Sequence, residues 1–174
     1  SMPSTCSVRS AERLSLRCAL SESSIGIVAG LVRTESLETL PYRRDRLVLV
    51  VPKDHALAGR QEVAFAETLD CDHVGLQESS AIHAFLRQVC DQLHRPLRLR
   101  IQVGNFEAAC RMVEANVGVA ILPESAARRH AQTMAIAIVP LSDPWAVREM
   151  KICVRSLEAL PAFARELVDL LVGD

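Results

Sequence analysis

Short apolar runs alternate with helical patterns along most of the chain, and this alternation constrains the fold more than any other feature. IGIVAG, which begins at Ile25, and RLVLVVP, which ends at Pro52, are continuous apolar runs bounded by glycine or proline. Such runs are typical of strands that are covered on both faces. Between the runs, apolar residues recur at the spacing of an amphipathic helix. The pattern predicts an α/β fold with largely parallel sheets.

Further strands are predicted at 73–76, 97–103, 117–122, 134–141 and 150–156, with helices between them. In 97–103, leucine, isoleucine and valine alternate with Arg98, Arg100 and Gln102, which predicts a strand near an edge of its sheet. The closing helix is predicted to bury one apolar face, made of Leu160, Phe163, Ala164, Leu167, Leu170 and Leu171.

The composition indicates a folded chain and excludes several classes of partner. Hydrophobic residues make up 49% of the 174, which is enough for a buried core. The formal charge of −1 and the 3% aromatic content argue against nucleic-acid binding by this chain itself. No apolar run approaches the roughly 20 residues of a membrane span, and no signal peptide is recognisable. Six dispersed cysteines favour reduced thiols, so we expect a cytoplasmic location without membrane contact.

Motifs of catalysis or cofactor binding are missing, since the sequence contains no GxSxG, HExxH, P-loop or GxGxxG. We therefore predict no catalytic residue, no cofactor and no metal site. Cys90 and His94 could share a metal ion, but a core thiol beside a surface histidine is the simpler interpretation. Asp45, among three arginines, is predicted to lie in a solvated turn before a strand. His55 and His73 are interpreted as surface or turn residues.

Two predicted helix starts are the best candidates for a binding site. In GLQESSAI and QVGNFEAA, small polar residues follow a strand and precede a helix. Free backbone N–H groups at such starts can hold a carboxylate or a phosphate, and ligands of parallel α/β sheets bind at the carboxyl ends of strands. The alternative is that Ser79, Ser80 and Asn105 only cap their helices.

Three segments together resemble the effector-binding domain of LysR-type transcriptional regulators. They are 25–59, 73–90 and 101–127, and their most specific phrases are RLVLVVPKDHALA and MVEANVGVAILPES. The resemblance covers Ile25 to about Val172. It implies a two-lobed fold similar to type 2 periplasmic binding proteins, with crossings near 51–53 and 139–141. The first lobe would comprise 25–51 and 140–174, and the second would comprise 52–139.

The resemblance also implies a cleft that binds a small effector. One wall would be the loop after IGIVAG, and the other two would be the helix start matching QESSA and the turn matching VGNF. The implied ligand-binding residues are Ala29, Gly30, Glu78, Ser79, Ser80, Gly104, Asn105 and Phe106.

The segment 1–24 departs from the family pattern. It is too short for the strands and helices with which the family's domain begins, and Ser24 stands where the family has an aspartate. We interpret it as a tag remnant or an atypical, poorly ordered segment, so the first lobe is expected to be incomplete. The chain resembles an N-terminally truncated piece without the winged helix-turn-helix and its linker helix.

The leading hypothesis is therefore the effector-sensing domain of a bacterial LysR-type regulator, with no enzymatic activity. It would bind a small metabolite, for which an anion is one candidate, and it would reach DNA only through the absent domain. The full-length protein is expected to form homo-oligomers. A transport solute-binding protein and, less favoured, an enzyme such as a dehydratase on the same fold are the alternatives.

Overall fold

The computed structural model describes residues 25–29 and 37–173, so the predicted atypical segment 1–24 lies outside the described residues. The chain divides into two compact units. The second unit spans Asp45–Val147, and the first is formed by the chain up to Arg44 and from Arg148 onward. No helix in the described part of the chain is long and apolar enough to cross a membrane.

The core of the second unit is built on the C-terminal half of strand β2 (Glu38–Pro52). β2 pairs antiparallel with β5 (Ala120–Pro123) along one edge and with β6 (Ile136–Pro140) along the other. Leu47–Val51 are fully buried there. The predicted crossings at 51–53 and 139–141 thus lie inside the second unit, because the apolar ends of both strands belong to its core.

Parallel pairing joins β3 (His73–Leu76) to β4 (Leu99–Val103). A parallel bridge between His73 and Val119 adds the residues just before β5 to the same layer. The α/β prediction is confirmed, but the sheets are less parallel than predicted, since β2 pairs antiparallel with both of its neighbours in this unit. A continuous apolar run shows that a strand is covered on both faces, and it does not specify the direction of the strand.

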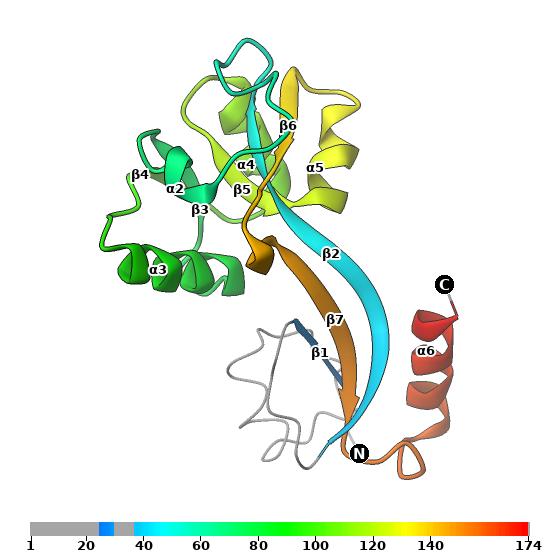
Figure 1. Ribbon diagram of the computed structural model, residues 1–174. Coiled ribbons are helices and arrows are strands. Elements are labelled where there is room, and N and C mark those ends of the chain that lie inside the picture. The colour runs from blue at the N-terminus through cyan, green and yellow to red at the C-terminus, as the bar shows by residue number, and fades with distance from the viewer. Residues whose placement is uncertain (1–24, 30–36, 174) are drawn as a thin grey trace. The chain divides into compact units, whose positions relative to one another are not determined.

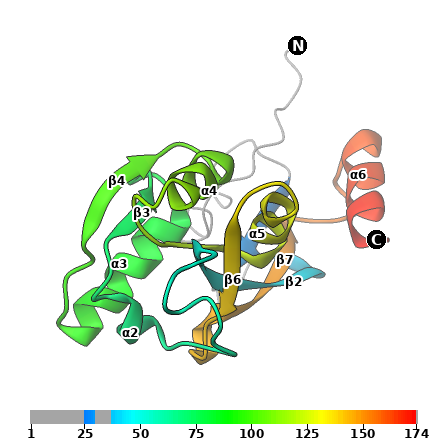
Figure 2. The same cartoon turned by 90° about the horizontal axis from the view of Figure 1, so that it is seen from above.

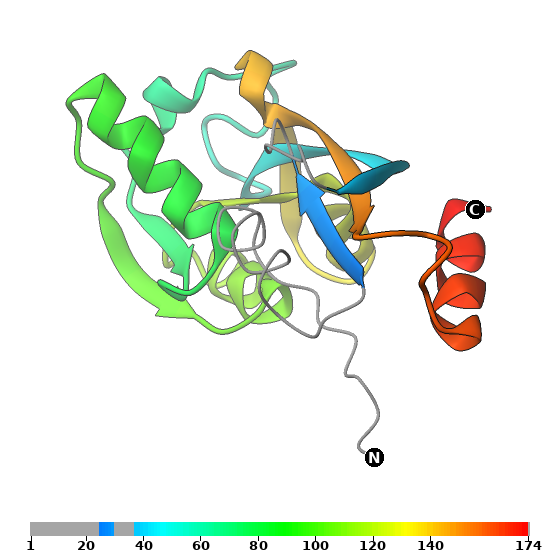
Figure 3. The same ribbon diagram turned by 90° about the horizontal axis from the view of Figure 1, so that it is seen from below.

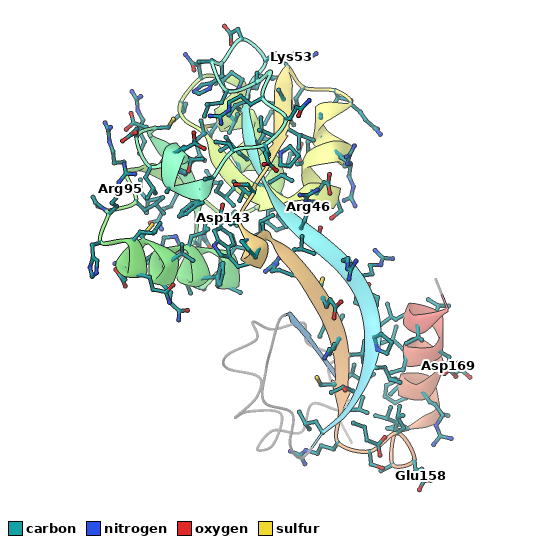
Figure 4. The ribbon with its side chains drawn as sticks, viewed as in Figure 1. Arg46, Lys53, Arg95, Asp143, Glu158 and Asp169 are labelled. Carbon is teal, nitrogen blue, oxygen red and sulfur yellow. The ribbon has the colours of Figure 1, made fainter. Side chains whose placement is uncertain are left out.

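Helices α2 (Phe65–Thr68), α3 (Ala81–Leu93), α4 (Phe106–Glu114) and α5 (Glu124–Ala131) flank these strands (Figure 1). In the view from above, α3 lies along β3 and β4 (Figure 2). α3 ends at Leu93, and the left-handed backbone of the C-cap residue His94 (φ 52°) stops the helix. The next residue, Arg95, donates to the Ala66 carbonyl at 2.8 Å and pairs with Asp70 at 2.7 Å, which ties this end of α3 to α2 (Figure 4).

A short 3₁₀ turn, η1 (Pro144–Ala146), follows β6 and closes the unit. The carboxylate of Asp143 accepts a hydrogen bond from the Phe65 backbone N–H at 2.7 Å (Figure 4). This bond satisfies the first N–H group of α2, so a residue 78 positions away caps that helix.

The first unit contains β1 (Ile25–Ala29), β7 (Val147–Val154), the N-terminal half of β2, and α6 (Ala162–Val172). β1 pairs antiparallel with β7, which neighbours β2 (Figure 3). The core of the unit lies between these strands and α6, and its buried members are Ile25, Ile152, Val154, Leu160, Ala164 and Val168.

Two predictions about side-chain positions are wrong. Asp45 lies within β2 and not in a turn before it, because the strand begins at Glu38. The polar N-terminal half of β2 makes cross-strand contacts, such as the 3.0 Å ion pair between Arg44 and Glu149. In α6, Phe163 and Leu170 are 59% and 69% exposed. The helix buries the narrower face of Ala164 and Val168, because the strands beneath it do not cover a stripe as wide as the predicted one.

Gly118 lies where the chain passes from α4 into β5, close to the backbone at Asp72. The Val119 N–H donates to the Asp72 carbonyl at 2.9 Å, and the Val74 N–H donates to the Val119 carbonyl at 2.8 Å. A Cβ atom on residue 118 would lie 2.6 Å from the Asp72 carbonyl oxygen. Only glycine fits this approach without a shift of the backbone.

Gly118→Ala is predicted to destabilise the protein by about 1–3 kcal/mol, the usual cost of overpacking. The free energy of unfolding, from urea denaturation, measures the effect. Gly59→Ala is the matched control, because a Cβ atom on residue 59 meets no atom within 4 Å; its effect should stay within about 0.5 kcal/mol. Equal stability of the two variants would contradict the close approach at Gly118.

Candidate functional site

The structure brings the two predicted helix starts of the second unit together. β3 and β4 run parallel with Leu76 opposite Val103, so the residues that follow both strands lie at the same edge of the sheet. A Cβ atom on Gly104 would lie 3.5 Å from the side-chain nitrogen of Gln77. The corner after β3, residues 77–80, is therefore the neighbour of the corner after β4, residues 104–105.

The start of α3 has unused hydrogen-bonding capacity. Ser80 is the N-cap residue, and its backbone N–H donates to the Gln77 carbonyl at 2.8 Å. Its side chain makes no capping hydrogen bond within the described structure, and the first turn of the helix contains no acidic residue. The first intrahelical bond runs from the Ala84 N–H to the Ser80 carbonyl at 3.1 Å. The N–H groups of residues 81–83 thus have no intrahelical acceptor and point toward the edge.

Glu78 and Ser79 complete this corner, and both are exposed. The hydroxyl groups of Ser79 and Ser80 can donate to an anion that the backbone N–H groups attract. Glu78 offers only acceptor oxygens when ionised, so it suits a hydroxyl or ammonium group of a ligand. The arrangement can bind a small polar molecule, and it contains no nucleophile activated by a base.

The start of α4 differs from that of α3, because its cap is in use. The Asn105 side-chain oxygen accepts a hydrogen bond from the Ala108 N–H at 2.7 Å, as the capping interpretation predicts. Glu107 already places a carboxylate in the first turn. Phe106 is half-buried and packs against the core, so its ring also has a structural role.

The start of α5 is likewise less suited to an anion than the start of α3. Glu124 lies in its first turn and pairs with Arg128 at 2.8 Å. A carboxylate at the positive end of a helix opposes the approach of a second anion. Of these three helix starts, α3 is the one whose N–H groups and cap hydroxyl remain available.

The predicted contacts from the first unit are only partly described. Ala29 is the last residue of β1, and its side chain and Gly30 lie outside the described residues. Their part in a binding site stays a prediction.

The histidines show where sequence reasoning failed. His73, predicted at the surface or in a turn, is 2% exposed in β3, and its Nε2 lies 2.9 Å from the Thr68 carbonyl oxygen. Burial lowers the pKa of His73. The apolar strand pattern of HVGL indicates a buried strand, and this pattern predicts the burial of His73 better than the polarity of its side chain does. His55 does lie in a turn, where its Nδ1 accepts from the Leu57 N–H at 3.1 Å.

His83 was not predicted to matter, yet it is 4% exposed in the first turn of α3. Its Nε2 is buried and has no hydrogen-bond partner among the described residues. Burial, and secondarily the charge of Arg87, lowers the pKa of His83, while Glu78 opposes this shift. The signal available in the sequence was its place beside Ile82 on the inward face of a predicted helix.

Cys90 is buried, whereas His94 is exposed at the C-cap of α3. This arrangement fits a core thiol beside a surface histidine. Within residues 25–29 and 37–173, no three His, Cys, Asp or Glu side chains come close enough to hold a metal ion.

Trp145, the single tryptophan of the chain, packs beside α3. Its ring lies edge-on to Phe85 of α3 at a centroid distance of 5.1 Å and edge-on to Phe65 at 5.6 Å. The sequence pattern did not indicate this cluster, because its members come from three separate elements. It gives a fluorescent reporter next to the helix whose start is the candidate site.

Solved structures of low sequence identity share the fold. The Synechocystis PCC6803 CcmR regulatory domain, solved in complex with 2-PG, superposes with a TM-score of 0.77 at 17% identity, covering 94% of this chain and 79% of that chain. The effector-binding domain of QuiR, solved in complex with shikimate, gives a TM-score of 0.67 at 16% identity over 87% of this chain and 71% of that chain.

Curated relatives are similar in sequence and longer. The HTH-type transcriptional regulator YbhD of Escherichia coli (strain K12) is 28% identical over 152 residues, or 87% of this chain and 48% of the relative. The HTH-type transcriptional regulator MJ0300 of Methanocaldococcus jannaschii is 30% identical over 138 residues, which are 76% of this chain and 47% of the relative. The chain spans about half the length of the relatives it matches.

The family comparison covers nearly the whole chain. Residues 7–174 match the LysR substrate binding domain. This match confirms the resemblance predicted from RLVLVVPKDHALA and MVEANVGVAILPES, and the solved structures agree in fold. The chain therefore belongs to the LysR substrate-binding domain family.

Proposed function

We propose that this chain is the sensory domain of a transcription regulator and binds a small anionic metabolite at the start of α3. The observation that carries the proposal is the combination of three N–H groups without intrahelical acceptors, a cap hydroxyl without a capping bond, and no acid in the first turn. Each of these features favours an anion at the positive end of a helix of 13 residues.

The proposed ligand contacts comprise residues of the second unit and two residues of the first unit that the family resemblance implies. The anionic group would bind the N–H groups of residues 81–83 and the hydroxyls of Ser79 and Ser80. Glu78 and the corner at 104–106 would contact the rest of the ligand. Ala29 and Gly30 remain proposed contacts on the strength of the resemblance.

The comparisons support a regulatory role over the alternatives. YbhD and MJ0300 are named as HTH-type transcriptional regulators, and not as enzymes or transport proteins. The CcmR and QuiR domains were each solved with a small molecule. We propose that the full-length protein acts in the cytoplasm and binds DNA through another domain. The effector would act through its different affinities for two states of the protein.

Homo-oligomer formation is part of the proposal, and β4 is the surface we assign to it. β4 pairs with β3 alone among the described strands, so one of its edges is open. Ile101 of β4 is 40% exposed, and Leu93, nearby in the sequence, is 41% exposed. An open strand edge with exposed apolar side chains is a suitable surface for a second copy.

Small carboxylates and phosphates are expected to stabilise the chain against heat. A ligand at 100 times its Kd should raise Tm by roughly 5–10 °C for a chain of this size. Thermal shift with a panel of such anions measures this, and Trp145 fluorescence should change in the same samples. If no member of the panel changes Tm or fluorescence, anion sensing at this site is wrong.

Ser80→Ala is the variant that links this binding to α3. It should weaken the stabilising anion about tenfold, as expected for the loss of one hydrogen bond to a charged group. Ser125→Ala, an exposed serine in the first turn of α5, is the matched control and should leave the affinity unchanged.

Asn105→Ala is predicted to affect stability more than Ser80→Ala does. It removes a capping bond and should lower the free energy of unfolding by about 1 kcal/mol. Ser80→Ala removes no capping bond, so its stability should stay within about 0.5 kcal/mol of the parent. Urea denaturation compares the two, and equal losses would show that Ser80 is an ordinary cap.

Ile101→Glu is expected to weaken self-association about tenfold, because burying an unpaired carboxylate in an interface is costly. Light scattering across a dilution series measures the change. Leu170→Glu on α6 replaces an even more exposed apolar residue, at 69%, and serves as the control that should associate normally. Weakening by Leu170→Glu alone would place the interface on α6 instead of β4.

A further inference from the structure

A small cavity lies between α3 and the strands beneath it, close to the candidate site. Its volume is about 10 Å³, and aliphatic side chains such as Leu76, Ile82, Leu86 and Leu99 form most of its wall. His73 and His83 are the polar side chains that line it. His73 already has the Thr68 carbonyl as a partner, whereas the Nε2 of His83 has none among the described residues.

The position of His83 connects this cavity to the start of α3. His83 is the third residue of the helix, so its own backbone N–H is one of the three without an intrahelical acceptor. Its imidazole leaves the same first turn and lines the cavity, so it lies on the inward side of the helix start.

The surroundings of His83 restrict what can bind its free nitrogen. An ionised group would lose its hydration against an aliphatic wall, so a charged partner is disfavoured. A volume of about 10 Å³ holds one group of the size of a water oxygen. A hydroxyl group meets both conditions, and it pairs with either tautomer of a neutral imidazole because it both donates and accepts.

We propose that the corner at α3 selects anions that also carry a hydroxyl group, and that His83 Nε2 binds this hydroxyl. The anionic group would occupy the N–H groups of residues 81–83 and the hydroxyls of Ser79 and Ser80, as in the proposed function on which this inference rests. Burial, and secondarily the charge of Arg87, lowers the pKa of His83, which favours the neutral imidazole that a bond to a neutral hydroxyl involves.

Two pairs of probes test the selection, malate against succinate and lactate against propionate. The members of each pair differ by one hydroxyl group. Titrations followed by Trp145 fluorescence and by thermal shift should show about tenfold tighter binding of the hydroxylated member to the parent protein. His83→Leu should reduce this ratio to below twofold while succinate and propionate bind as before. His83→Asn, which keeps a hydrogen-bonding group, should restore part of the ratio.

His94→Asn is the matched control on the same helix. His94 is exposed and has a left-handed backbone that asparagine tolerates, so the parent ratio should remain. His83→Leu should fold at least as stably as the parent, because it removes a buried nitrogen that has no partner among the described residues. If His83→Leu does not fold, the comparison of His83→Asn with the parent carries the test.

Equal affinities within both pairs in the parent protein would overturn the inference and would mean that His83 binds only water. The proposed function would survive that result, because succinate and propionate would still bind. A tenfold ratio that persists in His83→Leu would also overturn it, by assigning the hydroxyl to another residue. Failure of all four probes would refute the inference for these acids, and the wider anion panel then tests the proposed function separately.

Discussion

The burial of Leu47–Val51 in β2 is the constraint on which the second unit depends. These five side chains are fully buried, and the backbone between them bonds to β5 on one edge and β6 on the other. A strand covered on both faces and both edges leaves no polar backbone group exposed to an apolar layer. Backbone hydrogen bonds around Val119 join β3 to the residues just before β5, and β4 pairs with β3. This succession of neighbouring strands, starting from β2, thus positions the ends of β3 and β4.

The candidate site follows from that order. The parallel register of Leu76 with Val103 puts two corners side by side, and the helices that start there point their N–H groups toward the same edge. What distinguishes the corners is local chemistry. Asn105 uses its side chain to cap α4, whereas Ser80 leaves the first N–H groups of α3 unused. The Nε2 of His83, which has no hydrogen-bond partner among the described residues, belongs to that same first turn and lines a mostly aliphatic cavity.

Particular residues show how far the sequence could predict this arrangement. Asn105 was predicted as a cap, and its bond to the Ala108 N–H confirms it, because the Asn-x-x pattern before an apolar helical face is a local signal. The edge position of β4 and the buried strand HVGL were equally visible in local periodicity. Asp45, Phe163 and Leu170 were placed wrongly, since their surroundings depend on how long a neighbouring strand is and how much of a helix it covers.

The sequence by itself determined the α/β class, the positions of most strands and helices, the two polar helix starts and the family. Those properties depend on periodicity, capping residues and motif order within short windows. Only the tertiary structure decided that β2 runs antiparallel to its neighbours and that Trp145 packs on Phe85. Strand direction and contacts between distant elements arise from long-range pairing, which no local window of the sequence contains.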